Sequence, residues 1–211
     1  MGDEKFAKED GCLSYWNAAM TRFAVTLCFL LMMSSASAQS SNLVKNPNGD
    51  EGVQFWRVFG NASVSECSSV GKCFSINQDA FVFQDIDVPE STSGMYALFI
   101  SLSSIEQSNS QKLGQPYTYG YFMTSGDLRN ATVLANLSGQ EMANRPTANG
   151  VWVKQFGIFR VTERTGRIRT FLRGGCDKTE ASNNCVSHFR KAGVFLFGTE
   201  EEAKAFIESY Q

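Results

Sequence analysis

Histidine, proline and clustered basic residues are scarce in this sequence, and their scarcity excludes several classes of site. The 211 residues include one histidine and 4 prolines, and 19 Lys and Arg stand against 21 Asp and Glu, for a net charge of −2. Nucleic-acid binding relies on clustered basic side chains that neutralise phosphates. Neither such a cluster, nor a G-x-S-x-G nucleophile motif, nor a phosphate-binding loop occurs. We therefore expect a protein that is not an enzyme and has no nucleic-acid partner.

Long apolar runs are also missing, apart from Phe23–Met33. A transmembrane helix needs roughly 20 apolar residues, so this run is too short to span a membrane. Small residues follow it, and Ala36 and Ala38 form the A-x-A pattern that precedes signal peptidase cleavage. The pattern predicts a secretory signal peptide over residues 1–38 and no membrane span after its removal. An uncleaved signal anchor is the alternative.

Residues 1–19 are acidic, whereas the start of a signal peptide is typically positive. A start at Met20 would remove this conflict, so the sequence leaves open whether residues 1–19 are translated. Export predicts a secreted, extracellular protein. Asn-x-Ser/Thr triplets agree with export because they accept glycans on extracellular surfaces. They begin at Asn61, Asn130 and Asn136.

The cysteines outside the signal peptide are Cys67, Cys73, Cys176 and Cys185. An even number in an oxidising compartment indicates disulfides, and four cysteines allow three pairings. Sequence proximity favours Cys67–Cys73 and Cys176–Cys185, each contributing at most about 2–3 kcal/mol because its loop is short. A zinc site would need C-x-x-C spacing and further ligands, which are absent. We expect no metal and no cofactor.

Hydrophobic residues make up 43% of the sequence, enough for a packed core, and the length predicts one domain over residues 39–198. From Phe55 onward, apolar and polar residues alternate as in half-buried strands. The expected strands are Phe55–Phe59, Lys72–Ile76, Phe81–Val88, Met95–Ser103, Tyr117–Thr124, Thr132–Leu137, Val151–Val161, Arg167–Arg173 and Phe189–Phe197. Short strands without intervening helices indicate a β-sandwich. Thr199 and Glu202 form a capping box that predicts a short C-terminal helix over 199–211.

Two expected strands carry distinctive outward rows. In the strand 167–173, Arg167, Arg169, Phe171 and Arg173 share one face, opposite Ile168 and Leu172. A second row consists of Tyr117, Tyr119 and Tyr121. Such rows would form a surface for a sugar or an acid. In the alternative, the tyrosines belong to the core and the arginines are solvated.

The domain opens with NLVKNPNGDEG at residues 42–52, followed by Trp56. This pattern resembles the start of the F-box-associated sugar-binding domain. Later segments are similar to the wider galactose-binding-like group: FQDIDV at 83–88, GVWV at 150–153, FRV at 159–161, FLRGG at 171–175 and AGVFL at 192–196. The resemblance implies an all-β fold, a two-sheet antiparallel jelly roll that binds glycans without catalysis.

F-box-associated domains recognise N-glycans for ubiquitin ligases, but this chain has no F-box and carries an export signal, so that role is not transferred. The resemblance places glycan contacts in loops at one end of the sandwich, including the segment before the last strand. His188, Phe189 and Arg190 occupy that segment here. Asn183 and Asn184, in the neighbouring loop, are further candidates for ligand binding.

Related modules often hold a structural calcium near the first and last strands. Asn48, Asp50 and Glu51 offer oxygen ligands. Lys191 stands where those modules place an aspartate, and its charge would repel the ion, so we expect no calcium.

Other conspicuous side chains have simpler interpretations. We expect Trp56 and Trp152 to pack in the core. Asp85 and Asp87 lie two apart on one strand, so they cannot flank a glycosidic bond as hydrolysis requires. The sequence therefore predicts a secreted, non-catalytic, lectin-like module for glycans or glycoproteins. The alternative is an extracellular matrix or adhesion protein that binds another protein through a degenerate sugar-binding sandwich. The sequence specifies neither the partner nor the oligomeric state.

Overall fold

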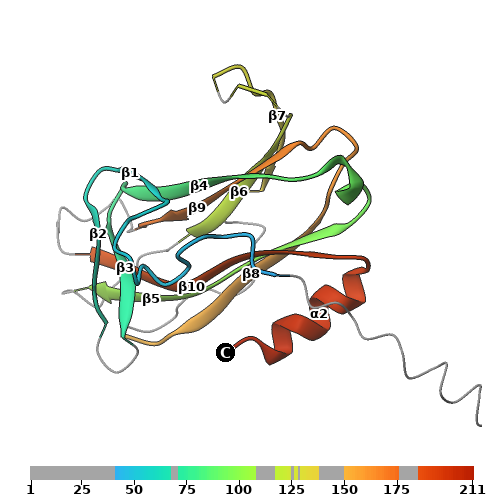
Figure 1. The fold of residues 1–211 in the computed structure, drawn as a ribbon. Helices are drawn as coiled ribbons and strands as arrows, with labels where there is room; N and C mark the ends of the chain where they lie inside the picture. Colours follow the sequence, from blue (N-terminus) through green and yellow to red (C-terminus); the bar gives the residue numbers. More distant parts are fainter. Residues whose placement is uncertain are drawn as a thin grey trace, which may run out of the picture. The chain divides into compact units, whose positions relative to one another are not determined.

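The computed structural model describes residues 41–67, 71–107, 117–124, 126–127, 129–137, 150–175 and 185–211. Within these residues the chain forms ten strands, a single-turn 3₁₀ helix η2 (Glu90–Thr92) and one α-helix. The strands build two antiparallel sheets that face each other (Figure 1). The all-β prediction with a short C-terminal helix is confirmed.

Sheet A, as we call it, has the strand order β1-β4-β9-β6-β7. Its members are β1 (Arg57–Phe59), β4 (Phe81–Asp87), β9 (Arg167–Arg173), β6 (Tyr117–Met123) and β7 (Val133–Leu137). Sheet B has the order β2-β3-β10-β5-β8. Its members are β2 (Ala62–Glu66), β3 (Lys72–Asn77), β10 (Cys185–Phe197), β5 (Tyr96–Gln107) and β8 (Val153–Arg160). Strands distant in sequence are neighbours in both sheets, as in a jelly roll.

Strand positions agree with the period-two pattern, with three differences. The sequence did not predict β2, which contains one large apolar residue, Val64, and lies at the edge of sheet B. In addition, β5 continues to Gln107 and β10 begins as early as Cys185. The two extensions pair with each other, from Cys185 opposite Gln107 onward. Pairing across the sheet thus continues both strands into segments where hydrophobic alternation is weak.

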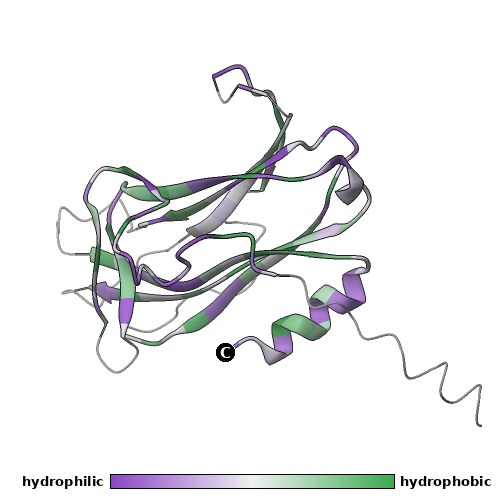
Figure 2. Ribbon diagram, in the orientation of Figure 1, coloured by the Kyte–Doolittle hydropathy of each residue, from purple (hydrophilic) through white to green (hydrophobic). Residues whose placement is uncertain are grey.

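The core fills the space between the sheets. Its largest fully buried side chains are Phe74, Phe99, Phe122 and Phe189. Trp56 is buried as expected, packs edge-on against Phe74 at 5.1 Å between ring centroids, and donates its indole N–H to the Asn46 carbonyl at 3.1 Å. Trp152 is half-buried. The alternation along the strands is visible in Figure 2 as mixed apolar and polar segments.

Helix α2 (Glu200–Ser209) begins with the capping box that the sequence predicted. The Thr199 hydroxyl accepts from the Glu202 backbone N–H at 3.2 Å, and the Glu202 carboxylate accepts from the Thr199 N–H at 3.1 Å. Ala203 and Ile207 pack on the outer face of sheet B in a second apolar cluster. The sheet contributes Leu98, Ile100, Phe195 and Phe197 to that cluster. The helix thus covers part of sheet B and leaves the outer face of sheet A uncovered by it. In the described part of the chain, no helix is long and apolar enough to cross a membrane.

Candidate functional site

The outer face of sheet A gathers aromatic and charged side chains that alternate with core residues. In β9, Ile168, Thr170 and Leu172 point inward and are buried. The pairing register places Phe171 between Phe83 of β4 and Tyr119 of β6. Paired residues in antiparallel strands share a face, so rows from separate strands merge on this surface. We call it the aromatic face and define it by Phe59, Phe81, Phe83, Tyr119, Tyr121 and Phe171.

The rings of the aromatic face form a continuous band across β1, β4, β9 and β6. Phe171 stacks on Tyr119 with centroids 4.7 Å apart and on Phe83 at 5.3 Å. Phe59 stacks on Phe81 at 4.8 Å. Stacked rings turn their faces toward one another, so the band meets solvent largely through ring edges. Phe59, at the end of the band, is 60% exposed.

Ion pairs run alongside this band. Arg169 and Asp85 form two hydrogen bonds, at 2.6 and 3.1 Å, and the Arg169 guanidinium carbon lies 4.6 Å from the Phe83 ring centroid. Both side chains are at least three-quarters buried, with exposures of 23% and 12%. Two-bond pairing of this kind fixes the orientation of both groups. The pair therefore presents a pre-oriented donor and acceptor beside the rings.

The other strand arginines also have acidic partners. Arg167 bonds Asp87 at 2.7 Å, and Arg173 bonds Asp79 at 3.3 Å. The same-strand carboxylates Asp85 and Asp87 are therefore engaged by β9. That the two carboxylates do not act as a catalytic pair stays a prediction.

The Tyr119 hydroxyl stays neutral at physiological pH. Burial raises the pKa of Tyr119 above its usual value, and the nearby Arg173 guanidinium opposes this only in part. A neutral phenol both donates and accepts hydrogen bonds. This hydroxyl therefore adds a versatile polar group to the aromatic face.

The described residues of the two predicted rows lie on the outer face of sheet A, where Phe171 is buried among its neighbours at 7% exposure. Tyr119 and Tyr121 are half-buried on the outer face, and the arginines are half-buried in ion pairs. Tyr117 is paired with Arg173, but its side chain lies outside the described part. The sequence could not show that β4 adds Phe81 and Phe83, because that depends on which strands are neighbours.

The residues predicted before the last strand lie on sheet B, not beside the tyrosines. Phe189 differs from the expectation that it contacts a ligand, because its ring is fully buried between the sheets and packs in the core. Arg190 is half-buried on the same strand. Asn183 and Asn184 lie outside the described residues. We therefore leave Phe189 out of the proposed ligand site.

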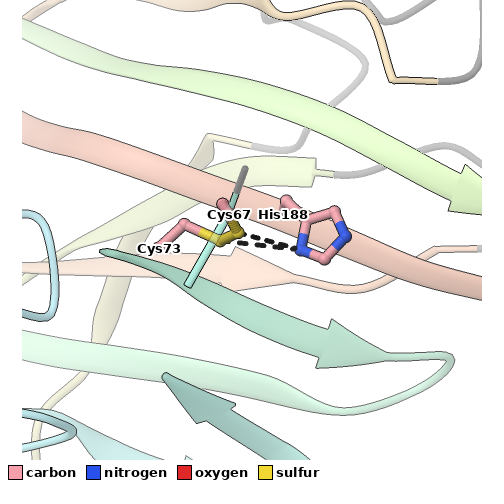
Figure 3. Close-up of side chains that lie close together, drawn as sticks. All are labelled: Cys67, Cys73 and His188. Carbon is pink, nitrogen blue, oxygen red and sulfur yellow. Dashed lines mark hydrogen bonds between the residues drawn. A yellow bond between two sulfur atoms is a disulfide. The ribbon is translucent and has the colours of Figure 1, made fainter. Parts of the chain in front are cut away.

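His188 lies on the outer face of sheet B beside a disulfide (Figure 3). The predicted Cys67–Cys73 bond is confirmed. Cys185 is disulfide-bonded, and Cys176 lies outside the described residues, so their pairing stays a prediction. Nδ1 of His188 is 3.0 Å from Oγ of Ser75, and Nε2 is 3.2 Å from the Glu106 carboxylate. Sequence analysis missed this cluster because His188 is 113 residues from Ser75 and 82 residues from Glu106.

The opening segment packs along β10, where the register shifts between Arg190 and Gly193. The Lys191 backbone N–H donates to Oδ1 of Asn48 at 3.0 Å. The Lys72 ammonium group donates to the Asp50 carbonyl at 2.9 Å, so an oxygen suited to calcium already binds a cationic side chain. The expectation that no calcium binds stays a prediction.

The predicted glycan acceptors Asn61, Asn130 and Asn136 are all exposed. Asn136 is opposite Tyr121 in the register of β6 and β7, at the border of the aromatic face. Their glycosylation stays a prediction.

No family model matches the chain, and neither does any curated protein. Among solved structures, it is similar to the CBM22-1 xylan-binding domain from Paenibacillus barcinonensis Xyn10C, with a TM-score of 0.52, 7% identity and coverage of 78% of this chain and 99% of that one. It is also similar to the enzymatically active domain of tailspike protein 4 from Bacteriophage CBA120, with a TM-score of 0.53 and 11% identity, covering 74% of this chain and 21% of that one.

At these identities the likeness shows the fold alone, a two-sheet antiparallel jelly roll. The finer resemblance to F-box-associated domains stays a prediction.

Proposed function

We propose that this protein binds carbohydrate without catalysis, through the aromatic face of sheet A. The observation that carries the proposal is the joining of an aromatic band to the pre-oriented Arg169–Asp85 pair on one open sheet face. The fold shared with a xylan-binding domain supports it. Helix α2 packs on the outer face of sheet B, away from this surface.

The chemistry of the face suits a sugar. A pyranose ring has apolar C–H surfaces, which pack on aromatic side chains. Its hydroxyls need suitably placed polar groups as hydrogen-bond partners. Phe83 and Tyr121 are half-buried rings on this face, while Arg169 has five N–H donors, of which Asp85 takes two. Remaining donors on Arg169 and the tyrosine hydroxyls are suited to bind sugar hydroxyls.

The charge balance favours a neutral glycan. Arg167, Arg169 and Arg173 each have an aspartate partner, so their charges are largely compensated. Only Arg57, whose guanidinium carbon lies 5.8 Å from the Phe83 centroid, adds positive charge among the described residues of this face without a described acidic partner. A surface built for sulfated or uronic sugars would expose uncompensated cations.

The proposal includes secretion and glycosylation. The apolar run before Ala38, the Cys67–Cys73 disulfide and the exposure of all three sequon asparagines support it. Expression through a secretory pathway, followed by enzymatic removal of N-glycans and mass measurement, tests this part separately from ligand binding.

A glycan array probed with the secreted, disulfide-intact protein tests carbohydrate binding. We expect Tyr121→Ala and Arg169→Met each to weaken binding by about tenfold, since each removes roughly 1.4 kcal/mol of contact. Arg190→Ala serves as the matched variant on sheet B and should leave affinity unchanged. Loss of binding with Arg190→Ala alone would move the site to the segment before the last strand, and no binding to any neutral glycan would refute the proposal.

Binding to another protein is the second candidate, and the exposure of Val58 and Phe59 favours it. These side chains are 41% and 60% exposed at the edge strand β1. Capture of a partner that persists after the partner's glycans are removed, and that Phe59→Ser abolishes, would support this alternative.

A further inference from the structure

The cluster formed by Cys67, Cys73 and His188 on sheet B has a geometry that its disulfide alone does not require (Figure 3). We infer that, once the disulfide is reduced, both thiolates and Nδ1 of His188 bind Zn²⁺ or a similar thiophilic divalent cation. The site is separate from the proposed carbohydrate site, since Cys73 lies in β3, His188 in β10 and Cys67 directly after β2, all on sheet B.

Distances in the oxidised protein already match the metal geometry. Nδ1 of His188 lies 3.5 Å from Sγ of Cys67 and 3.6 Å from Sγ of Cys73. In tetrahedral zinc sites, Zn–S is about 2.3 Å and Zn–N about 2.1 Å, which gives a nitrogen–sulfur separation of about 3.6 Å. The imidazole therefore stands at ligand spacing from both sulfurs, and only the sulfurs must move apart.

Glu106 orients the imidazole for this role. Its carboxylate lies 3.2 Å from Nε2 of His188. A hydrogen bond from Nε2–H to this carboxylate leaves the lone pair of Nδ1 facing the sulfurs, an arrangement typical of metal-binding histidines. In the oxidised protein the Ser75 hydroxyl is 3.0 Å from Nδ1 and can donate to that lone pair. A metal ion would replace this hydrogen bond and keep a fourth position for water.

The framework around the sulfurs does not depend on the disulfide. The β2–β3 hairpin pairs Ser65 with Cys73 and continues to the hydrogen bond from the Cys67 N–H to the Gly71 carbonyl at 2.8 Å. Residue 75 pairs with His188 on the other side of β3. Reduction opens a loop with a sequence separation of only 6, so the fold loses at most the small stabilisation that closing so short a loop contributes. Both cysteines are buried, which keeps the freed thiols near the imidazole.

The chemistry balances with a phosphine or a dithiol as reductant. A phosphine and water convert the disulfide into two thiols and become a phosphine oxide; a dithiol supplies two electrons and two protons and becomes a disulfide. Binding of the metal then releases the two thiol protons to solvent. Thiolates bind the metal, whereas the sulfurs of a disulfide do not. The redox state of Cys67 and Cys73 therefore controls metal binding.

Titration of the phosphine-reduced full chain with Co²⁺, without air or a histidine tag, tests the inference. We expect the thiolate-to-cobalt absorption band in the reduced protein and its absence from the oxidised one. The Cys67→Ser variant should bind one equivalent of Co²⁺ less than the wild type. Because both proteins contain the same remaining cysteines, this difference isolates the metal bound at Cys67. Glu106→Gln should weaken affinity by about tenfold, as for other orienting carboxylates. Glu90→Gln, at an exposed glutamate outside the cluster, is the control and should leave the affinity for Co²⁺ unchanged. Equal binding by wild type and Cys67→Ser would overturn the inference.

A second measurement is independent of whether the variants fold. His188 is the only histidine, so its imidazole nitrogen resonances are assigned without mutagenesis. One equivalent of Zn²⁺ should shift the Nδ1 resonance in the reduced wild type and leave it unchanged in the oxidised protein. An unshifted Nδ1 resonance in reduced, folded protein would equally refute the site.

Discussion

Gly120 of β6 lies where the backbone of β9 and the core ring of Phe99 leave no room for a side chain. A Cβ at this position would lie 2.4 Å from the Arg169 carbonyl oxygen and 2.7 Å from the Phe99 ring. Backbone cannot move away as a flexible side chain can. We predict that Gly120→Ala destabilises the fold by about 1–3 kcal/mol, the usual cost of overpacking.

Urea unfolding of Gly120→Ala beside Gly198→Ala checks this prediction. The nearest atom to a Cβ at Gly198 is a Glu202 carboxylate oxygen at 3.4 Å, the end of a flexible side chain. Equal stability losses in both variants would contradict the steric explanation.

Tyr210 gives the fold a pH dependence in the alkaline range. Its ring packs near Phe195 and Phe206, its hydroxyl bonds to the Lys191 carbonyl, and burial raises the pKa of Tyr210 to about 12. In the unfolded chain, the Tyr210 hydroxyl ionises with the ordinary tyrosine pKa of about 10. The stabilisation by neutral Tyr210 is therefore complete below about pH 10 and is lost as the pH rises toward 12, at a cost on the order of 2 kcal/mol.

Comparison of wild type with Tyr210→Phe by urea unfolding at about pH 9 and pH 11 isolates this group from other titrating residues. The wild type should lose more stability between the two pH values than the variant does. Parallel losses would show that Tyr210 ionises freely in the folded protein.

At the scale of single residues, sequence reasoning succeeded where a local pattern determines the environment. Trp56 is buried, and Asp85 and Asp87 share a face. It failed for Phe189, whose place in an aromatic and basic segment suggested a surface role. Strand alternation turns Phe189 inward, and only the register with Phe74 shows this directly.

Among the secondary-structure elements, α2 depends most on local sequence. Thr199→Ala removes the hydroxyl that accepts from the Glu202 N–H. We predict a loss of about 1 kcal/mol, typical for an N-cap, together with faster amide exchange in the first turn of the helix. Ser209→Ala, which removes a hydroxyl bonded to the Phe206 carbonyl in the last turn, is the control and should cost less. An effect of Thr199→Ala no greater than that of Ser209→Ala would argue against the cap.

Most strands were predictable because half-buried strands alternate with period two, and β9 was predicted over its whole length. The edge strand β2 was missed because its outward serines and Glu66 leave little apolar alternation. Its existence follows from pairing with β3, which also carries Cys73.

For the molecule as a whole, the position of Asn136 beside Tyr121 links the predicted glycosylation to the proposed ligand site. A glycan on Asn136 would cover part of the aromatic face and compete with a ligand there. We predict that Asn136→Gln in secreted protein binds immobilised glycans several-fold more tightly than the wild type. Asn130→Gln, in the turn before β7, should have no such effect. If the wild type carries a glycan on Asn136 and Asn136→Gln still has the same affinity, the glycan does not cover the ligand site and the prediction is wrong.

The sequence by itself determined the layers of this protein: alternating strands, a capped C-terminal helix, and short-range pairing of Cys67 with Cys73. Each of these depends on neighbours within a few residues, where periodicity and chain proximity constrain the structure. Only the tertiary structure decided which strands are adjacent. That adjacency joins Phe83, Phe171 and Tyr119 into one face and brings His188 to the disulfide. Strand order and register arise from burial and pairing across the whole core, so no local stretch of sequence contains them.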